Sequence, residues 1–258
     1  MYKSSFSLYT SAIAVGSLLN PQSSPNAIKV ASVGILLHIS NCLNIVSVGC
    51  SWVVHPYDWE EKIRLDKVNP TIKYITEEDT KKYSFAKYLA DKLNIPYYNL
   101  ASAGTSNDFI FKRLFKRINE YDLKDSFVII GLTDPQRHQF GKLGFKYADS
   151  KDGFWNWKKT FFTEFYDEEI RIREITMMLD LFNEYLKNKN SKLVVFNSFT
   201  NEVKYPKRNY FFNKFKTWKD YICSYDNRYV YEHNVHPIEY DHKKLADILY
   251  KEYFNGQN

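Results

Sequence analysis

Short apolar runs alternate with longer amphipathic stretches along the chain from Asn44 onward. Runs of this length, bounded by polar residues, are typical of strands buried on both faces of a parallel sheet. They predict four strands, at residues 45–49, 97–101, 127–131 and 192–196.

Between these strands, apolar residues recur with the spacing of one helix face. The spacing predicts helices at residues 84–93, 107–119, 167–187 and 239–254. The apolar face of the second helix comprises Ile110, Leu114, Phe115 and Ile118. The third helix carries a longer set, namely Ile170, Ile175, Met178, Leu179, Leu181, Phe182 and Leu186.

Strands and helices that alternate at these lengths predict an α/β fold, a three-layer α/β/α sandwich with a central parallel sheet. We expect residues 44–258 to form one such domain, with an aromatic-rich insertion near 141–165. Sites in parallel sheets lie in the loops at the carboxyl ends of the strands. A functional site is therefore expected in the loops after Gly49, Ala101 and Gly131 and in the segment before the last helix.

The first 43 residues differ from the rest, since Lys3 and Lys29 are their only charged side chains. A membrane span at 30–48 would bury His38 and two asparagines, and it would consume the first strand. A cleaved secretory signal is the other alternative, but its apolar core would be short and rich in hydroxyl groups. We expect a poorly ordered N-terminal extension and no membrane span.

Composition narrows the class of protein further. Of the 258 residues, 44% are hydrophobic and 26% are charged, which is enough apolar mass for a packed core. The net charge of +6 is scattered along the chain, so no nucleic-acid partner is expected. The three cysteines include no CxxC pair, which excludes a disulfide framework and favours a reducing, cytoplasmic compartment.

Ser51 and His236 are the residues that best fit a chemical role. Ser51 follows the first predicted strand just after Gly49, and His236 stands in the loop that leads into the last helix. A serine hydroxyl becomes a nucleophile when a base lies beside it, so this pair points to acyl transfer. His233, His236 and His242 do not suggest a metal site, because no further ligand cluster stands at matching spacing.

At these positions the sequence resembles the SGNH (GDSL-like) hydrolases, and particularly their divergent bacteriophage-encoded forms. The resemblance rests on four ordered blocks that span most of the chain. They are Val48-Gly49-Cys50-Ser51, Asn99-Leu-Ala-Ser-Ala-Gly104, Ile130-Gly131-Leu132-Thr133-Asp134, and His236-Pro237 followed by Asp241-His242-Lys-Lys-Leu-Ala246.

The resemblance implies that Ser51 is the nucleophile and His236 the general base. It also implies that the main-chain amides of Ser51 and Gly104 bind the oxyanion. The asparagine that the family uses as a further oxyanion donor falls on Thr133, whose hydroxyl has a shorter reach. Asn107 is the alternative donor, if its helix start points inward.

The acid of the family's triad falls on His233 in this sequence. A histidine cannot stabilise an imidazolium as a carboxylate does. Glu232, Asp226 and a main-chain carbonyl are therefore open alternatives for orienting His236.

Three further side chains have a structural interpretation beside a functional one. His242 is expected to be a solvated residue of the first helical turn rather than a ligand. Arg137 could bind an anionic substrate group or be solvated. Trp155 and Trp157 are interpreted as residues that pack in the core or in a lid, and stacking on a sugar ring is the alternative.

The expected function is that of a serine esterase that hydrolyses a small acyl ester, such as a glycan O-acetyl ester, with no cofactor. A catalytically weakened binding or structural protein, for example of a virus particle, is one alternative. An acyltransferase that uses the same serine is another. For a phage-encoded protein, the expected location is the host cytoplasm or the virion; the oligomeric state stays open.

Overall fold

The computed structural model describes residues 42–54, 81–118, 120, 123–137, 139–140, 143–144, 160–198, 203–226 and 236–255. All of them belong to one unit, Leu36–Asn258. The expected N-terminal extension, most of the aromatic-rich insertion, His233 and Glu232 lie outside the described residues. Within the described ranges, no helix is both long and apolar enough to cross a membrane.

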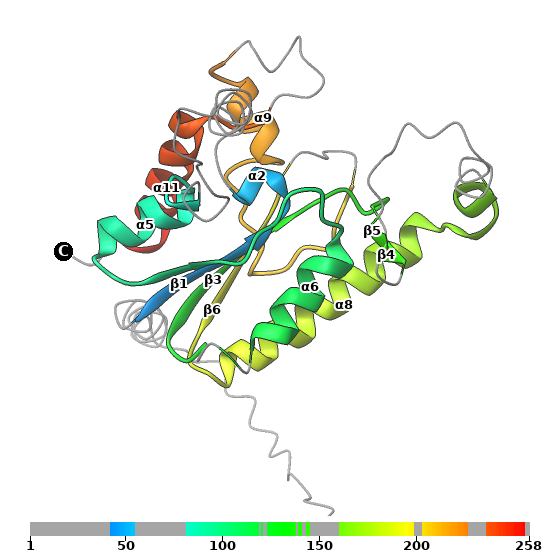
Figure 1. Ribbon diagram of the computed structural model, residues 1–258, viewed down its shortest axis with the longest axis horizontal. Helices are drawn as coiled ribbons and strands as arrows, with labels where there is room; N and C mark the ends of the chain where they lie inside the picture. Colours follow the sequence, from blue (N-terminus) through cyan, green and yellow to red (C-terminus); the bar gives the residue numbers. More distant parts are fainter. Residues whose placement is uncertain are drawn as a thin grey trace, which may run out of the picture. The chain divides into compact units, whose positions relative to one another are not determined.

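A four-stranded parallel sheet forms the centre of the fold (Figure 1). Its strands are β1 (Asn44–Gly49), β2 (Tyr97–Asn99), β3 (Ser126–Leu132) and β6 (Lys192–Asn197), in the order β2-β1-β3-β6. All four strands stand where the apolar runs predicted them. Every residue of β3 is buried, as expected of a central strand covered on both faces.

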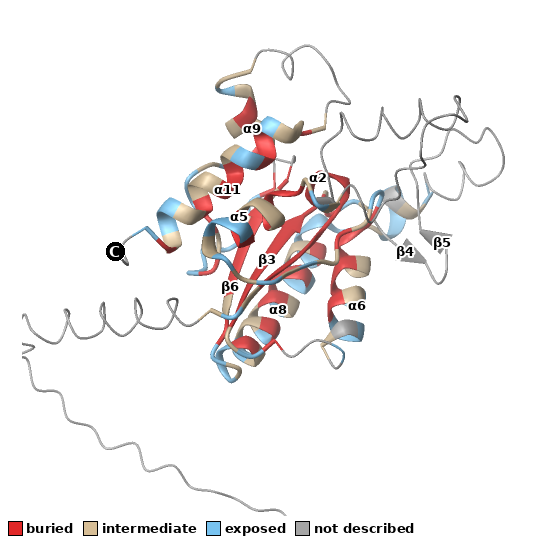
Figure 2. Ribbon diagram, turned by 60° about the vertical axis from the view of Figure 1, so that its left-hand side comes forward, coloured by how far each residue is buried: buried red, intermediate tan, exposed pale blue. Residues whose placement is uncertain are grey.

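Helices cover both faces of this sheet (Figures 1 and 2). One face packs against α5 (Phe85–Leu93), α9 (Trp218–Cys223) and α11 (Glu239–Tyr253) through strand residues such as Ile45, Ile129 and Val194. The other packs against α6 (Asn107–Arg117) and α8 (Glu168–Lys187) through residues such as Val46, Ile130 and Val195. The predicted three-layer α/β/α fold is therefore confirmed.

Three apolar residues that the spacing placed on buried faces are exposed instead. Phe115 is 46% exposed, Ile170 51% and Leu181 64%. The helix α8 packs through a narrow strip formed by Ile175, Leu179, Phe182 and Leu186. Ile170 and Leu181 project from the opposite side, so the predicted face of this helix was too wide.

Several short elements were not predicted from the sequence. The helix α2 (Ser51–Val54) follows β1 at once, and α9 lies between β6 and α11. A π-helical turn at Phe161–Phe165 precedes α8, and β4 (Gln139–Phe140) pairs antiparallel with β5 (Leu143–Gly144).

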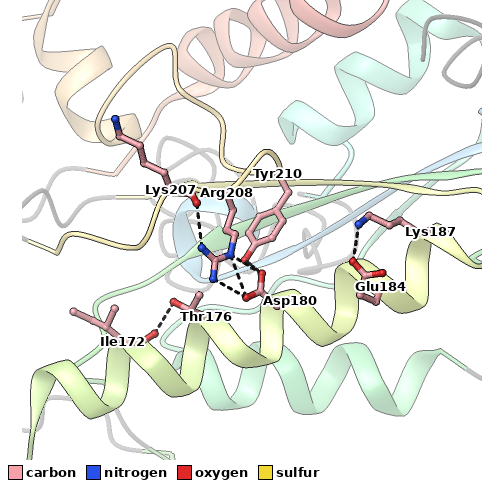
Figure 3. Close-up of polar contacts among 8 residues, drawn as sticks. All are labelled: Ile172, Thr176, Asp180, Glu184, Lys187, Lys207, Arg208 and Tyr210. Carbon is pink, nitrogen blue, oxygen red and sulfur yellow. Dashed lines mark hydrogen bonds and ion pairs between the residues drawn. The ribbon is translucent and has the colours of Figure 1, made fainter. Parts of the chain in front are cut away.

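The outer edge of β6 is covered by the segment that follows it. Val195 N donates to Tyr210 O at 2.8 Å, and Phe212 N donates to Val195 O at 2.8 Å. Asp180 of α8 holds this segment, because it accepts hydrogen bonds from the Arg208 guanidinium and from the Tyr210 hydroxyl at 2.8 Å (Figure 3). The Arg208 hydrogen bonds lower the pKa of Asp180, and they outweigh the effect of burial.

Two glycines let α2 lie directly on the ends of β1 and β3. Gly49 and Gly131 are partners in the parallel register. A Cβ on Gly49 would come within 2.9 Å of Gly131 O and closer still to Val53 of α2. A Cβ on Gly131 would likewise overlap the Val53 methyl group. Side chains at either position would push α2, and with it Ser51, away from the sheet.

We predict that Gly131→Ala lowers the free energy of unfolding by about 1–3 kcal/mol, because it overpacks the contact with Val53. Removing the opposing methyl groups in the Gly131→Ala/Val53→Ala double variant should recover part of that loss. Denaturant unfolding of the two single variants and the double variant measures the coupling. Strictly additive losses would contradict a direct contact.

We also predict that Asp180→Asn destabilises the fold at pH 7 by less than Gly131→Ala does, since the Arg208 and Asp180 side chains are 41% and 38% exposed and solvent weakens their ion pair. Because the folded-state pKa of Asp180 is lowered from 3.8, its contribution is complete above that pH and is lost as the pH falls through the folded pKa.

Unfolding of wild type and Asp180→Asn between pH 7 and pH 2 tests this, with Glu184→Gln, on the same helix, as the control. The stability difference between wild type and Asp180→Asn should shrink below about pH 4. A difference that stays constant with pH would exclude the lowered pKa as its cause.

Candidate active site

Ser51 and His236 come together at the carboxyl end of β1. Ser51 is the first residue of α2, and His236 lies two residues before Ile238, the N-cap of α11. The Ser51 Oγ lies 2.8 Å from His236 Nε2, although the two residues are 185 positions apart in the sequence. This is hydrogen-bonding distance for transfer of the hydroxyl proton to the imidazole.

Trp52 lies against the His236 ring. Their ring centroids are 6.0 Å apart, and Trp52 also makes an edge contact with Trp218 at 6.0 Å. Trp52 and Trp218 are both buried. One side of the imidazole therefore rests on the aromatic core between α2 and α9.

The start of α11, which carries His236 just before it, is held by a buried carboxylate. Asp241 accepts hydrogen bonds from Ile238 N and from the Tyr225 hydroxyl, each at 2.8 Å. The first bond satisfies an amide that has no partner within the helix, and the second ties α11 to the turn after α9. These bonds hold the start of α11, two residues after His236.

The expectation that His242 is solvated is wrong. Its side chain is fully buried, and its Nδ1 accepts a hydrogen bond from Phe85 N at 3.1 Å. Phe85 begins α5, so its amide has no acceptor within its own helix. His242 thus acts as a cap that joins the starts of α5 and α11. No group of three potential metal ligands occurs among the described residues.

The loop after β2 is bonded to the strand that precedes Ser51. Ser102 N donates to Gly49 O at 3.1 Å, and the Thr105 hydroxyl donates to the same oxygen at 3.2 Å. Gly104 between them is exposed and has a φ of 68°, a conformation that favours glycine. Among the described residues, the amides of Ser51 and Gly104 donate to no acceptor.

Asn107 and Thr133 are bonded to each other. Asn107 Nδ2 donates to Thr133 O at 3.0 Å, and Thr133 N donates to Asn107 Oδ1 at 3.0 Å. Asn107 is fully buried, and the Thr133 Oγ1 atom is buried too. The side-chain amide of Asn107 is therefore engaged by the main chain after β3.

Cys50, beside Ser51, has a buried thiol. Burial raises the pKa of Cys50, while the Arg137 charge and the Ser198 and Thr133 hydroxyls oppose that rise more weakly. The thiol is thus held in its protonated, poorly nucleophilic form.

Of the three side chains considered as the group that orients His236, only Asp226 lies within the described residues. His233 and Glu232 lie outside the described ranges. Asp226 follows α9, and its amide donates to Ile222 O at 2.9 Å.

The role of Asp241 in holding the start of α11 was not predicted from the sequence, although a carboxylate three residues after the N-cap residue is a known capping signal.

No protein-family model matches the sequence, and no curated protein matches it. Among solved structures, the chain is similar to a carbohydrate esterase at 13% identity and a TM-score of 0.41, over 83% of this chain and 68% of that chain. It is similar to a carbohydrate esterase family 2 enzyme with a carbohydrate-binding domain from Corynascus thermopiles (Myceliophthora fergusii), at 12% identity and a TM-score of 0.43, over 81% and 65% of the two chains. The chain thus spans about two thirds of the length of these two proteins.

A third similar structure is that of a protein described as a GDSL-like lipase from Parabacteroides merdae. The identity is 13% and the TM-score 0.40, over 82% of this chain and 95% of that chain.

We predict that Asp241→Ala lowers the free energy of unfolding by about 2–4 kcal/mol, because it removes both hydrogen bonds and leaves the Ile238 amide without its acceptor. Tyr225→Phe removes only one of the two hydrogen bonds and should cost about 1 kcal/mol. Denaturant unfolding of both variants measures the difference. Equal losses would show that the bond to Ile238 N adds nothing.

Proposed function

We propose that this chain is a serine esterase that hydrolyses a carboxylic ester through an acyl-Ser51 intermediate. The observation that carries the proposal is the 2.8 Å contact between Ser51 Oγ and His236 Nε2. Burial and a raised pKa make the neighbouring Cys50 the weaker nucleophile.

In the first half-reaction, His236 Nε2 takes the Ser51 proton as Oγ attacks the ester carbonyl carbon. The oxyanion that forms is bound by the main-chain amides of Ser51 and Gly104, which have no acceptor among the described residues. Collapse of this intermediate breaks the bond to the alcohol, whose oxygen receives the proton from His236.

In the second half-reaction, His236 removes a proton from water, and the resulting hydroxide attacks the acyl carbon. The Ser51 oxygen then leaves with that proton, which releases the carboxylic acid and restores the enzyme. The proposed orienting group for His236 is one of His233, Glu232, Asp226 and a main-chain carbonyl. The proposed substrates are a glycan O-acetyl ester or another small acyl ester, the class implied by the resemblance to SGNH hydrolases.

One observation favours a second candidate, a catalytically weakened protein that binds its ligand without turnover. The two side chains considered as extra oxyanion donors are turned inward, since Asn107 bonds the Thr133 main chain and Thr133 Oγ1 is buried. A site with fewer oxyanion donors is a slower one, because one lost donor costs about 3 kcal/mol of barrier.

Labelling with a fluorophosphonate, together with hydrolysis of 4-nitrophenyl acetate, separates the two candidates. We predict that the wild type is labelled and active, and that Ser51→Ala and His236→Ala lower kcat by about 10⁴-fold or more. Ser224→Ala, which changes an exposed serine on the turn after α9, is the matched control and should behave as the wild type.

Labelling that survives Ser51→Ala would overturn the proposed nucleophile. A wild type that is neither labelled nor active would favour the binding protein.

A further inference from the structure

The segment from Ser102 to Asn107 bridges the ends of two strands. At one end, Ser102 N and the Thr105 hydroxyl both donate to Gly49 O of β1. At the other, Asn107 bonds the main chain of Thr133, directly after β3. Gly104, the proposed oxyanion donor, lies between these two anchors. Its distance from Ser51 is therefore set by bonds to the strands on which the site is built.

The pairing of Asn107 with Thr133 requires a particular side chain. A carboxamide presents one donor and one acceptor in the same plane, and here each is 3.0 Å from its main-chain partner. Both main-chain groups would otherwise be buried without a partner, which costs about 1–3 kcal/mol for each group. An apolar or hydroxyl side chain at position 107 cannot satisfy both.

The next residue along α6 is anchored from the other side. Asp108 Oδ1 lies 2.7 Å from Arg171 Nη2 of α8, and Arg171 is 6% exposed. Arg171 also contacts Glu174 at 3.2 Å. The first turn of α6 is thus held between β3 and α8 and cannot shift without breaking this partly exposed ion pair.

The polar groups of Thr133 all point into the protein. Its amide and carbonyl are bonded to Asn107, and its hydroxyl oxygen is buried. An oxyanion donor has to face the substrate, with its hydrogen aimed at the reacting oxygen. The Thr133 hydroxyl does not meet that requirement.

We propose that Asn107 is a positioning residue that fixes the Gly104 loop against the end of β3, and that the oxyanion is bound by main-chain amides without the Thr133 hydroxyl. This inference rests on the proposed esterase function. It assigns to Asn107 an indirect role, in which its side chain touches Thr133 and not the substrate.

Steady-state hydrolysis of 4-nitrophenyl acetate by Asn107→Ala, Asn107→Asp and Thr133→Val tests the inference. Asn107→Ala should lower kcat by about 10- to 100-fold with KM within about threefold, because misplaced donors weaken the transition state more than the ground state. Asn107→Asp keeps the size and the acceptor but loses the donor, so it should fall in the same range. Thr133→Val, which removes only the hydroxyl, should change kcat by less than about threefold.

A fall of about 100-fold or more in Thr133→Val would assign the hydroxyl to the oxyanion and overturn the inference alone. So would unchanged kcat in both Asn107 variants. Thermal unfolding of each variant identifies one that does not fold, and Thr133→Val then decides the question. A wild type without Ser51-dependent turnover would overturn the proposed function, and this inference with it.

Discussion

The close packing of Val53 on Gly49 and Gly131 is the constraint on which the site depends. Side chains at the carboxyl ends of parallel strands normally separate the strand ends from a helix that follows one of them. Here the two paired glycines, Gly49 and Gly131, have no side chains, so Val53 of α2 packs directly on the sheet. Ser51, the first residue of α2, therefore lies at the end of β1. His236, two residues before the N-cap of α11, lies at the same edge and contacts Ser51.

Buried polar side chains hold the surrounding loops by satisfying main-chain groups. Asp241 accepts from Ile238 N, His242 accepts from Phe85 N, and Asn107 pairs with both main-chain groups of Thr133. Two of the three serve amides in or next to helix starts, where the main chain has no internal partner. Because an unsatisfied buried group is costly, each contact fixes one conformation of its loop. The buried polar residues of this edge thus fix the conformations of the loops and also contribute to the stability of the fold.

The layers of the fold were predictable because buried parallel strands and one-sided helices leave strong apolar patterns. The spacing of apolar residues does not predict burial correctly where burial depends on residues that are distant in the sequence. Leu181 has helical spacing but faces solvent, since α8 needs only a narrow strip to cover the sheet. His242 is polar but buried, because the start of α5, 157 residues away, needs an acceptor. The contact between Ser51 and His236 could be expected from the order of the motifs, whereas the burial of the Thr133 hydroxyl could be seen only in the structure.

Two potential nucleophiles stand side by side at the end of β1, and their surroundings separate them. The Cys50 side chain is directed into the core, where burial raises its pKa and suppresses the thiolate that would react. In the proposed reaction Ser51 needs no ionised form of its own, because the imidazole of His236, 2.8 Å away, can accept its proton during attack. Cys50 follows the last residue of β1 and belongs to the core cluster on this face of the sheet, whereas Ser51 begins α2 and contacts His236. A thiol in the first position is therefore compatible with serine chemistry in the second.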